Sequence, residues 1–213
     1  MSTLFILGST GLVGGQALAL ALSSKRISCV IAPTRRALSP HVRLVNPRMD
    51  SILDSNDPEN WRADGAICAL GTTLKKAGSA SAFRTVDHDL VLGLAARLKQ
   101  GGVQRFVLLS SLGADPHARF LYPRTKGEVE QEIERLGFLS FTILRPGFLD
   151  GQRTEKRAME DVMGRLLRFA SPILPRSARL SSSSLVAERL VEAATLAPEG
   201  KHVIPSAALS ERW

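Results

Sequence analysis

The feature that most constrains the fold is the stretch FILGSTGLVGG, in which Gly8, Gly11 and Gly14 recur at intervals of three residues. A short apolar run, Thr3–Leu7, precedes the first glycine, and an Ala/Leu-rich segment, Leu12–Leu22, follows. In a strand–turn–helix unit these glycines permit a tight turn, a close approach of a pyrophosphate and close helix–strand packing. The N–H groups at the start of the helix also favour bound phosphates. The alternative is a tight turn with no ligand.

The rest of the chain alternates short apolar runs with helical patterns. Helices are predicted at Ala82–Lys99, from its apolar spacing, and at Lys126–Leu136, which Gly137 ends. Further strands are predicted at Ile27–Ala32, Val42–Val45, Ala66–Leu70, Arg105–Leu109 and Phe141–Leu144. This order predicts an α/β fold, a Rossmann-like doubly wound parallel sheet with helices on both faces.

The pattern loosens after Asp150. One helix is expected at about 155–169 and another at about 184–195, followed by a final strand in the sequence HVIPS. We interpret residues 1–213 as a single NAD(P)-binding domain. Within it, residues of about 151–213 are expected to form a small C-terminal cap on the substrate side.

The end of the second strand bears on the kind of dinucleotide. An acidic residue there would bind the ribose 2′-hydroxyl of NAD, but the sequence has Arg35 and Arg36 instead. Guanidinium groups suit a 2′-phosphate through charge-assisted hydrogen bonds. We therefore predict NADP(H) in preference to NAD(H); the alternative is that both are solvated loop arginines.

Five motifs in order, GSTGLVG, CALGTT, LLSSLGAD, YPRTKGEVE and LRPG, give the chain a family resemblance. It resembles the atypical short-chain dehydrogenase/reductases (SDRs), most closely the Tat-interacting-protein-like subgroup and its bacterial oxidoreductase-like relatives. The resemblance extends from about Thr3 to Asp150. Together with the glycine turn and the two arginines, it gives an expected cofactor site of Gly8, Ser9, Thr10, Gly11, Leu12, Val13, Gly14, Arg35, Arg36, Leu70, Gly71, Thr72, Lys126 and Pro146.

The same resemblance implies catalytic roles. Ser110 or Ser111 would orient a substrate carbonyl, and Tyr122 would donate or accept the proton. Lys126 would hold the nicotinamide ribose and favour the ionised form of the tyrosine. A cation one helical turn from a phenol agrees with this assignment. Pro123 disfavours helical backbone at the preceding residue, so Tyr122 is expected at the N-cap rather than inside the helix.

The sequence departs from the family pattern in the stretch RTVDHD. Many relatives carry an Asn where this chain has Asp87, and that Asn helps to build a water site. A carboxylate could still hold a water while altering the electrostatics. Asp87 and His88 are otherwise expected on the helix surface. The chain also lacks the long C-terminal substrate region of the sugar-nucleotide-modifying members, which disfavours a bulky nucleotide-sugar substrate.

Composition excludes some classes of protein. The net charge of +8 and pI near 10.2 are compatible with nucleic-acid binding, but the charges are dispersed and no aromatic-plus-basic signature accompanies them. Cys29 and Cys68 lie in apolar runs, and the four histidines form no ligand pattern, so no disulfide or metal site is expected. No stretch matches a signal peptide or a membrane span, which predicts a cytoplasmic protein.

Two hypotheses of different classes follow. The first is an NADP(H)-dependent oxidoreductase that reduces a small carbonyl, or oxidises the alcohol, with Tyr122 and Lys126 as its acid–base pair. The second is a catalytically weak or inactive NADP(H)-binding redox sensor that acts through protein partners. Expected partners are a small-molecule substrate and either a second copy of the chain or another protein.

Overall fold

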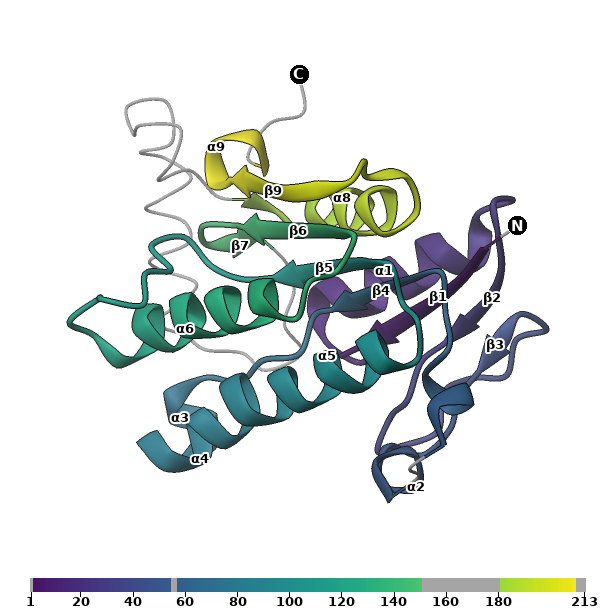
Figure 1. Ribbon diagram of the computed structural model, residues 1–213, viewed down its shortest axis with the longest axis horizontal. Helices are drawn as coiled ribbons and strands as arrows, with labels where there is room; N and C mark the ends of the chain where they lie inside the picture. Colours follow the sequence, from purple (N-terminus) through teal and green to yellow (C-terminus); the bar gives the residue numbers. More distant parts are fainter. Residues whose placement is uncertain (1, 55–56, 151–180, 210–213) are drawn as a thin grey trace.

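The computed structural model describes residues 2–54, 57–150 and 181–209. Its centre is a seven-stranded sheet with the order β3-β2-β1-β4-β5-β6-β9, in which every neighbouring pair is parallel (Figure 1). The strands are β1 (Ser2–Leu7), β2 (Ile27–Ile31), β3 (Leu44–Val45), β4 (Gly65–Cys68), β5 (Arg105–Leu109), β6 (Ser140–Arg145) and β9 (Gly200–Pro205). The predicted Rossmann-like α/β fold is confirmed.

Helices cover both faces of the sheet. On one face lie α1 (Leu12–Ser23) and α8 (Ser183–Leu196), and on the other α5 (Val91–Gln100) and α6 (Leu121–Arg135). Shorter elements complete the described chain: α2 (Met49–Asp54), the 3₁₀ turn η1 (Pro58–Trp61), α3 (Leu74–Ala77), α4 (Ala80–Arg84), the π-helical turn η2 (Thr85–Leu90) and α9 (Ser206–Leu209).

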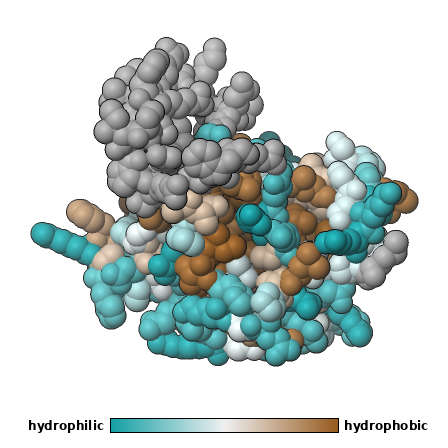
Figure 2. Space-filling model, turned by 90° about the horizontal axis from the view of Figure 1, so that it is seen from above, coloured by the Kyte–Doolittle hydropathy of each residue, from teal (hydrophilic) through white to brown (hydrophobic). Residues whose placement is uncertain are grey.

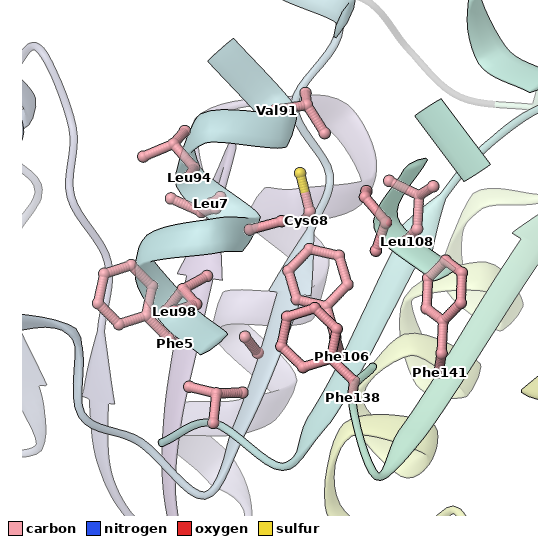
Figure 3. Close-up of a cluster of buried hydrophobic side chains, with 14 of the residues drawn as sticks. Phe5, Leu7, Cys68, Val91, Leu94, Leu98, Phe106, Leu108, Phe138 and Phe141 are labelled. Atoms are coloured by element: carbon pink, nitrogen blue, oxygen red, sulfur yellow. The ribbon is translucent and has the colours of Figure 1, made fainter. Parts of the chain in front are cut away.

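Side chains that alternate along the strands build two apolar layers. In β1, Phe5 and Leu7 pack toward α5 and α6, whereas Leu4 and Ile6 pack toward α1 and α8. Figure 3 shows the first layer, in which Phe106 stacks on Phe138 with ring centroids 4.7 Å apart. Because strands buried on both faces need apolar residues at successive positions, these strands read as continuous apolar runs in the sequence.

The C-terminal part differs from the expected cap. Residues 181–209 belong to the main fold, because α8 packs beside α1 and β9 pairs with β6 as the seventh strand. Ser181–Ser182 forms β8, which pairs in parallel with β7 (Leu149–Asp150) in a separate two-stranded sheet. The helix expected at 155–169 lies outside the described residues.

The outer edge of β9 is the end of the sheet, and no described strand pairs with it. Figure 2 looks onto this side of the molecule and shows apolar residues among hydrophilic ones. Lys201 on β9 pairs with Glu134, with 2.5 Å between the charged groups, and Pro205 ends the strand. Charged side chains and proline are typical of edge strands that do not pair with other chains.

Candidate functional site

The chain changes direction across the sheet between β1 and β4. It runs outward from β1 to β2 and β3 and then returns to β4 on the other side of β1. Gly8 directly follows β1 with φ +85°, and a Cβ there would lie 2.6 Å from the carbonyl carbon of Ala69. A Cβ on Gly14 would lie 2.2 Å from the carbonyl oxygen of Gly8. Glycine is therefore required at both positions, and the two strand ends lie at the switch point where such sheets bind ligands.

The turn after β1 has features that fit a diphosphate. Gly11 is the N-cap of α1 and has no side chain, and its own N–H donates to the carbonyl of Gly8 at 3.0 Å. Thr10 and Gly11 are exposed. The hydroxyl of Ser9 is buried and lacks a hydrogen-bond partner among the described residues. Val13 packs into the core, so its backbone alone is available to a ligand.

The loop after β2 presents Arg35 and Arg36 to solvent. Asn46 braces it, because its Nδ2 donates to the carbonyl of Ala32 at 2.6 Å and to the hydroxyl of Thr34 at 2.8 Å. The Thr34 hydroxyl in turn donates to the carbonyl of Arg36 at 2.6 Å. Between residues 32 and 43 the sequence contains no Asp or Glu. The arginines are thus carried by an ordered loop without an acidic neighbour in the sequence.

Asp87, on η2, links α6 to the loop after β4. Lys126 Nζ lies 2.8 Å from Asp87 Oδ1, and Asp87 Oδ2 accepts the Thr72 N–H at 2.7 Å. Both side chains are buried, with Lys126 8% and Asp87 0% exposed. A Cβ on Gly71 would lie 3.2 Å from Asp87 Oδ1 and 3.6 Å from Lys126 Nζ. Of the predicted cofactor residues, Gly71, Thr72 and Lys126 therefore lie together around Asp87.

Tyr122 lies one helical turn from Lys126. The N-cap of α6 is Phe120, so Tyr122 is inside the helix, and the expectation of an N-cap tyrosine was wrong. Proline is tolerated at position 123 because the first N–H groups of a helix have no intrahelical partner. Lys126 Nζ lies 6.0 Å from the centroid of the Tyr122 ring, which is partly exposed and packs against Phe83.

The expectation that Asp87 and His88 lie on a helix surface was also wrong, because both are buried. They belong to η2, and a π-helical turn places one more residue in each turn than an α-helix does. Both side chains consequently face α6, where His88 Nε2 lies 3.2 Å from Glu132 Oε1. The helical spacing of the apolar residues gave no sign of this turn.

The two serines after β5 have different surroundings. Ser110 is buried and its hydroxyl donates to the carboxylate of Glu130. Arg145, at the end of β6, donates to the same carboxylate from Nε at 3.1 Å and from Nη2 at 2.5 Å. This hydrogen bonding to Glu130 raises the pKa of Arg145 above its ordinary value. By contrast, the buried Ser111 hydroxyl has no partner among the described residues.

Pro146, the last predicted cofactor residue, lies at the same edge of the sheet. Its carbonyl accepts the Leu112 N–H at 2.8 Å, which ties the loops after β5 and β6 together. Sequence reasoning missed Glu130 and Arg145, although charged residues next to apolar runs, in GEVE and LRPG, were the available signal.

The described residues give no indication of two other kinds of site. They contain no group of three or more His, Cys, Asp or Glu side chains placed to hold a metal ion. Across the same ranges, no helix has both the length and the apolar character that crossing a bilayer demands.

Comparison with curated proteins identifies the family, although no family model matches the sequence. Over 168 residues the chain is 39% identical to the protein FMP52, mitochondrial, of Candida albicans, covering 75% of this chain and 72% of that protein. Over 211 residues it is 30% identical to the Aspergillus clavatus protein of the same name, covering 94% and 90%. The chain belongs to the FMP52 family. Both relatives are named as mitochondrial, which contradicts the cytoplasmic location expected from the sequence.

Solved structures share the fold of this FMP52-family chain at low sequence identity. MoeE5 in complex with UDP-glucose and NAD has a TM-score of 0.72 and 20% identity, covering 95% of this chain and 75% of that one. The Bordetella bronchiseptica enzyme WbmH in complex with NAD⁺ also has a TM-score of 0.72, with 16% identity and coverage of 97% and 76%. These neighbours support the resemblance to the atypical SDRs at the level of the fold; the Tat-interacting-protein-like subgroup stays a prediction.

Proposed function

We propose that the chain is an NADP(H)-dependent oxidoreductase that acts on a small carbonyl compound or the corresponding alcohol. The observation that carries the proposal is the convergence of Tyr122, Lys126 and Gly71 at the carboxyl edge of the sheet, next to the switch point. Related folds have been solved with NAD bound, as the names of MoeE5 and WbmH state.

The glycine turn would hold the diphosphate at the N-terminus of α1. Arg35 and Arg36 favour the phosphorylated dinucleotide, since they are exposed on a braced loop that lacks an acidic residue for a free 2′-hydroxyl. When bound, the reduced nicotinamide supplies the hydride. Lys126 would contact the neighbouring ribose from its buried position beside Gly71.

Side chains of the protein would transfer the proton to the substrate. Tyr122, partly exposed at the start of α6, would donate its phenolic proton to the carbonyl oxygen as hydride arrives. The nearby Lys126 ammonium would stabilise the resulting phenolate. We assign the hydrogen bond to the substrate carbonyl to Ser111 rather than Ser110, because the hydroxyl of Ser110 is already bound to Glu130.

Turnover and binding measured on the same preparation test this proposal. We expect stoichiometric NADPH binding and oxidation of NADPH in the presence of some members of a panel of small aldehydes and ketones. Tyr122→Phe should lower kcat by at least about 100-fold, the typical effect of losing a general acid, while the Kd for NADPH stays within about twofold. Unchanged turnover would refute the role of Tyr122. Tight NADPH binding without turnover of any substrate would favour the redox-sensor alternative.

A further inference from the structure

Asp87 connects two parts of the proposed site that are distant in the sequence. One carboxylate oxygen accepts the Thr72 N–H in the loop after β4, and the other lies 2.8 Å from Lys126 Nζ on α6. Asp87 itself comes from the π-helical turn η2. π-helical turns are rare and frequently occur at functional sites, so this placement calls for a specific explanation.

Because the Asp87–Lys126 ion pair is buried, it determines where the Lys126 ammonium lies. A buried ammonium is costly unless it is paired, and the Asp87 carboxylate is the anionic partner that the structure provides within 4 Å among the described residues. An unpaired lysine has a flexible side chain with three rotatable donors. The buried ion pair next to Gly71 instead restricts the Lys126 ammonium to one position. Since the backbone of Thr72 fixes Asp87, the position of the ammonium is defined relative to the loop after β4.

Two neighbouring contacts also link this part of the chain to α6. Arg84 Nη1 lies 2.5 Å from Glu128 Oε2, and His88 Nε2 lies 3.2 Å from Glu132 Oε1. Arg84 is the last residue of α4, so the three contacts join α6 to the continuous stretch that runs from the end of α4 into η2. Asp87 therefore lies in a segment that contacts α6 at three points.

We propose that Asp87 is a positioning residue that sets where Lys126 acts. By holding the ammonium next to the loop after β4, it places one cation within reach of both the cofactor ribose and Tyr122. This inference rests on the proposed function. It assigns Asp87 no contact with substrate, because Oδ2 accepts the Thr72 N–H and Oδ1 faces the Lys126 ammonium at 2.8 Å.

A double-mutant cycle of Asp87→Asn, Lys126→Met and the double variant measures the effect of Asp87 that depends on Lys126. Asparagine can still accept the Thr72 N–H, so the first substitution removes the charge and leaves the loop contact. The double variant replaces the ion pair by a neutral pair of similar volume, which avoids the uncompensated charge that each single variant leaves. Asp87→Glu is the matched charge-conserving variant, because it retains the carboxylate and displaces it by one methylene group.

The first readout is the Kd for NADPH, from its fluorescence on titration, which needs no turnover; the second is kcat. We expect Asp87→Asn to weaken NADPH binding and lower kcat by roughly tenfold when Lys126 is present, and by less than about twofold in the Lys126→Met background. Asp87→Glu should fold and also lower kcat. Equal effects of Asp87→Asn in both backgrounds, or wild-type behaviour of Asp87→Glu, would overturn the inference.

The failure of the inference and the failure of the proposed function give different results. NADPH binding without turnover in the wild-type chain would count against the oxidoreductase alone, because the cycle can be completed on Kd values. Absence of NADPH binding by the wild-type chain would overturn both. If Asp87→Asn or Lys126→Met does not fold, the comparison of Asp87→Glu with wild type still decides the inference.

Discussion

Arg145 donates two hydrogen bonds, from Nε and Nη2, to the buried carboxylate of Glu130. The same carboxylate accepts a hydrogen bond from the hydroxyl of Ser110, so the loop after β5, α6 and β6 meet at one group. Glu130 lies one helical turn after Lys126, on the same side of α6. The network therefore holds the helix that carries Tyr122 and Lys126 against the strands whose ends form the proposed substrate site.

We predict that Glu130→Ala destabilises the fold. The substitution leaves Arg145 and the buried Ser110 hydroxyl without their acceptor. We expect a loss of about 2–3 kcal/mol in the free energy of unfolding, which is less than the loss for a fully buried ion pair because Arg145 is partly exposed. Urea denaturation followed by circular dichroism measures the effect. Glu130→Gln, which keeps an acceptor of the same shape, should lose less. Equal losses in the two variants would show that the hydrogen bonds contribute little.

A second prediction concerns the glycine turn. Gly14→Ala should destabilise the chain by at least about 1–3 kcal/mol, because the new methyl group would overlap the backbone carbonyl of Gly8, which cannot move aside. The matched control is Gly93→Ala in α5, where a Cβ has no neighbour within 4 Å. That change should stabilise the fold by about 0.5–1 kcal/mol through helix propensity. Thermal unfolding of both variants is the measurement, and a tolerated Gly14→Ala would contradict the packing argument.

The sequence predicted the strands and the first turn well because both depend on local rules. An apolar run between two turns predicts a buried strand, and the spacing of Gly8, Gly11 and Gly14 reports a backbone requirement at each position. The contacts of Asp87 and Glu130 depend instead on how α6 lies against η2 and the strands. A buried carboxylate and a surface carboxylate look alike in a sequence, and a π-helical turn leaves no periodic signal. The start of α6 was misjudged because proline's bias against a preceding helical residue is a preference that tertiary contacts can override.

The third prediction tests dinucleotide selection. Replacing Arg35 or Arg36 by Ala should raise the Kd for NADPH by roughly tenfold or more, as expected for a lost hydrogen bond to a charged group, and leave the Kd for NADH unchanged. Arg26→Ala is the matched control, since Arg26 is exposed near the opposite end of β2. Fluorescence titration of wild type and each variant with both dinucleotides gives the Kd values. A parallel loss of NADH and NADPH affinity would mean that the arginines do not recognise the 2′-phosphate.

The fourth prediction follows from Cys68, which is fully buried at the end of β4. Burial disfavours the thiolate and raises the pKa of Cys68 to about 11. In the unfolded chain the thiol has its ordinary pKa of 9.0. A group whose pKa is raised on folding stabilises the fold at pH values below its pKa in the unfolded state. This stabilisation is lost as the pH rises toward the pKa of the group in the folded state. The contribution is therefore complete below pH 9 and declines between pH 9 and 11.

The expected loss attributable to Cys68 is about 1 kcal/mol at pH 10, since each unit of pKa difference corresponds to about 1.4 kcal/mol. Other groups titrate in the same range, so the measurement is the difference between wild type and Cys68→Ala in urea denaturation at pH 8 and pH 10. The free energies of unfolding of the two proteins should converge as the pH rises, because the variant lacks the thiol term. Iodoacetamide at pH 8 gives an independent check: Cys29, which is only partly buried, should react well before Cys68 in the folded chain. Rapid alkylation of Cys68 without unfolding, or a wild-type to variant difference that does not change with pH, would mean that the thiol is not enclosed by the apolar layer between the sheet and α5.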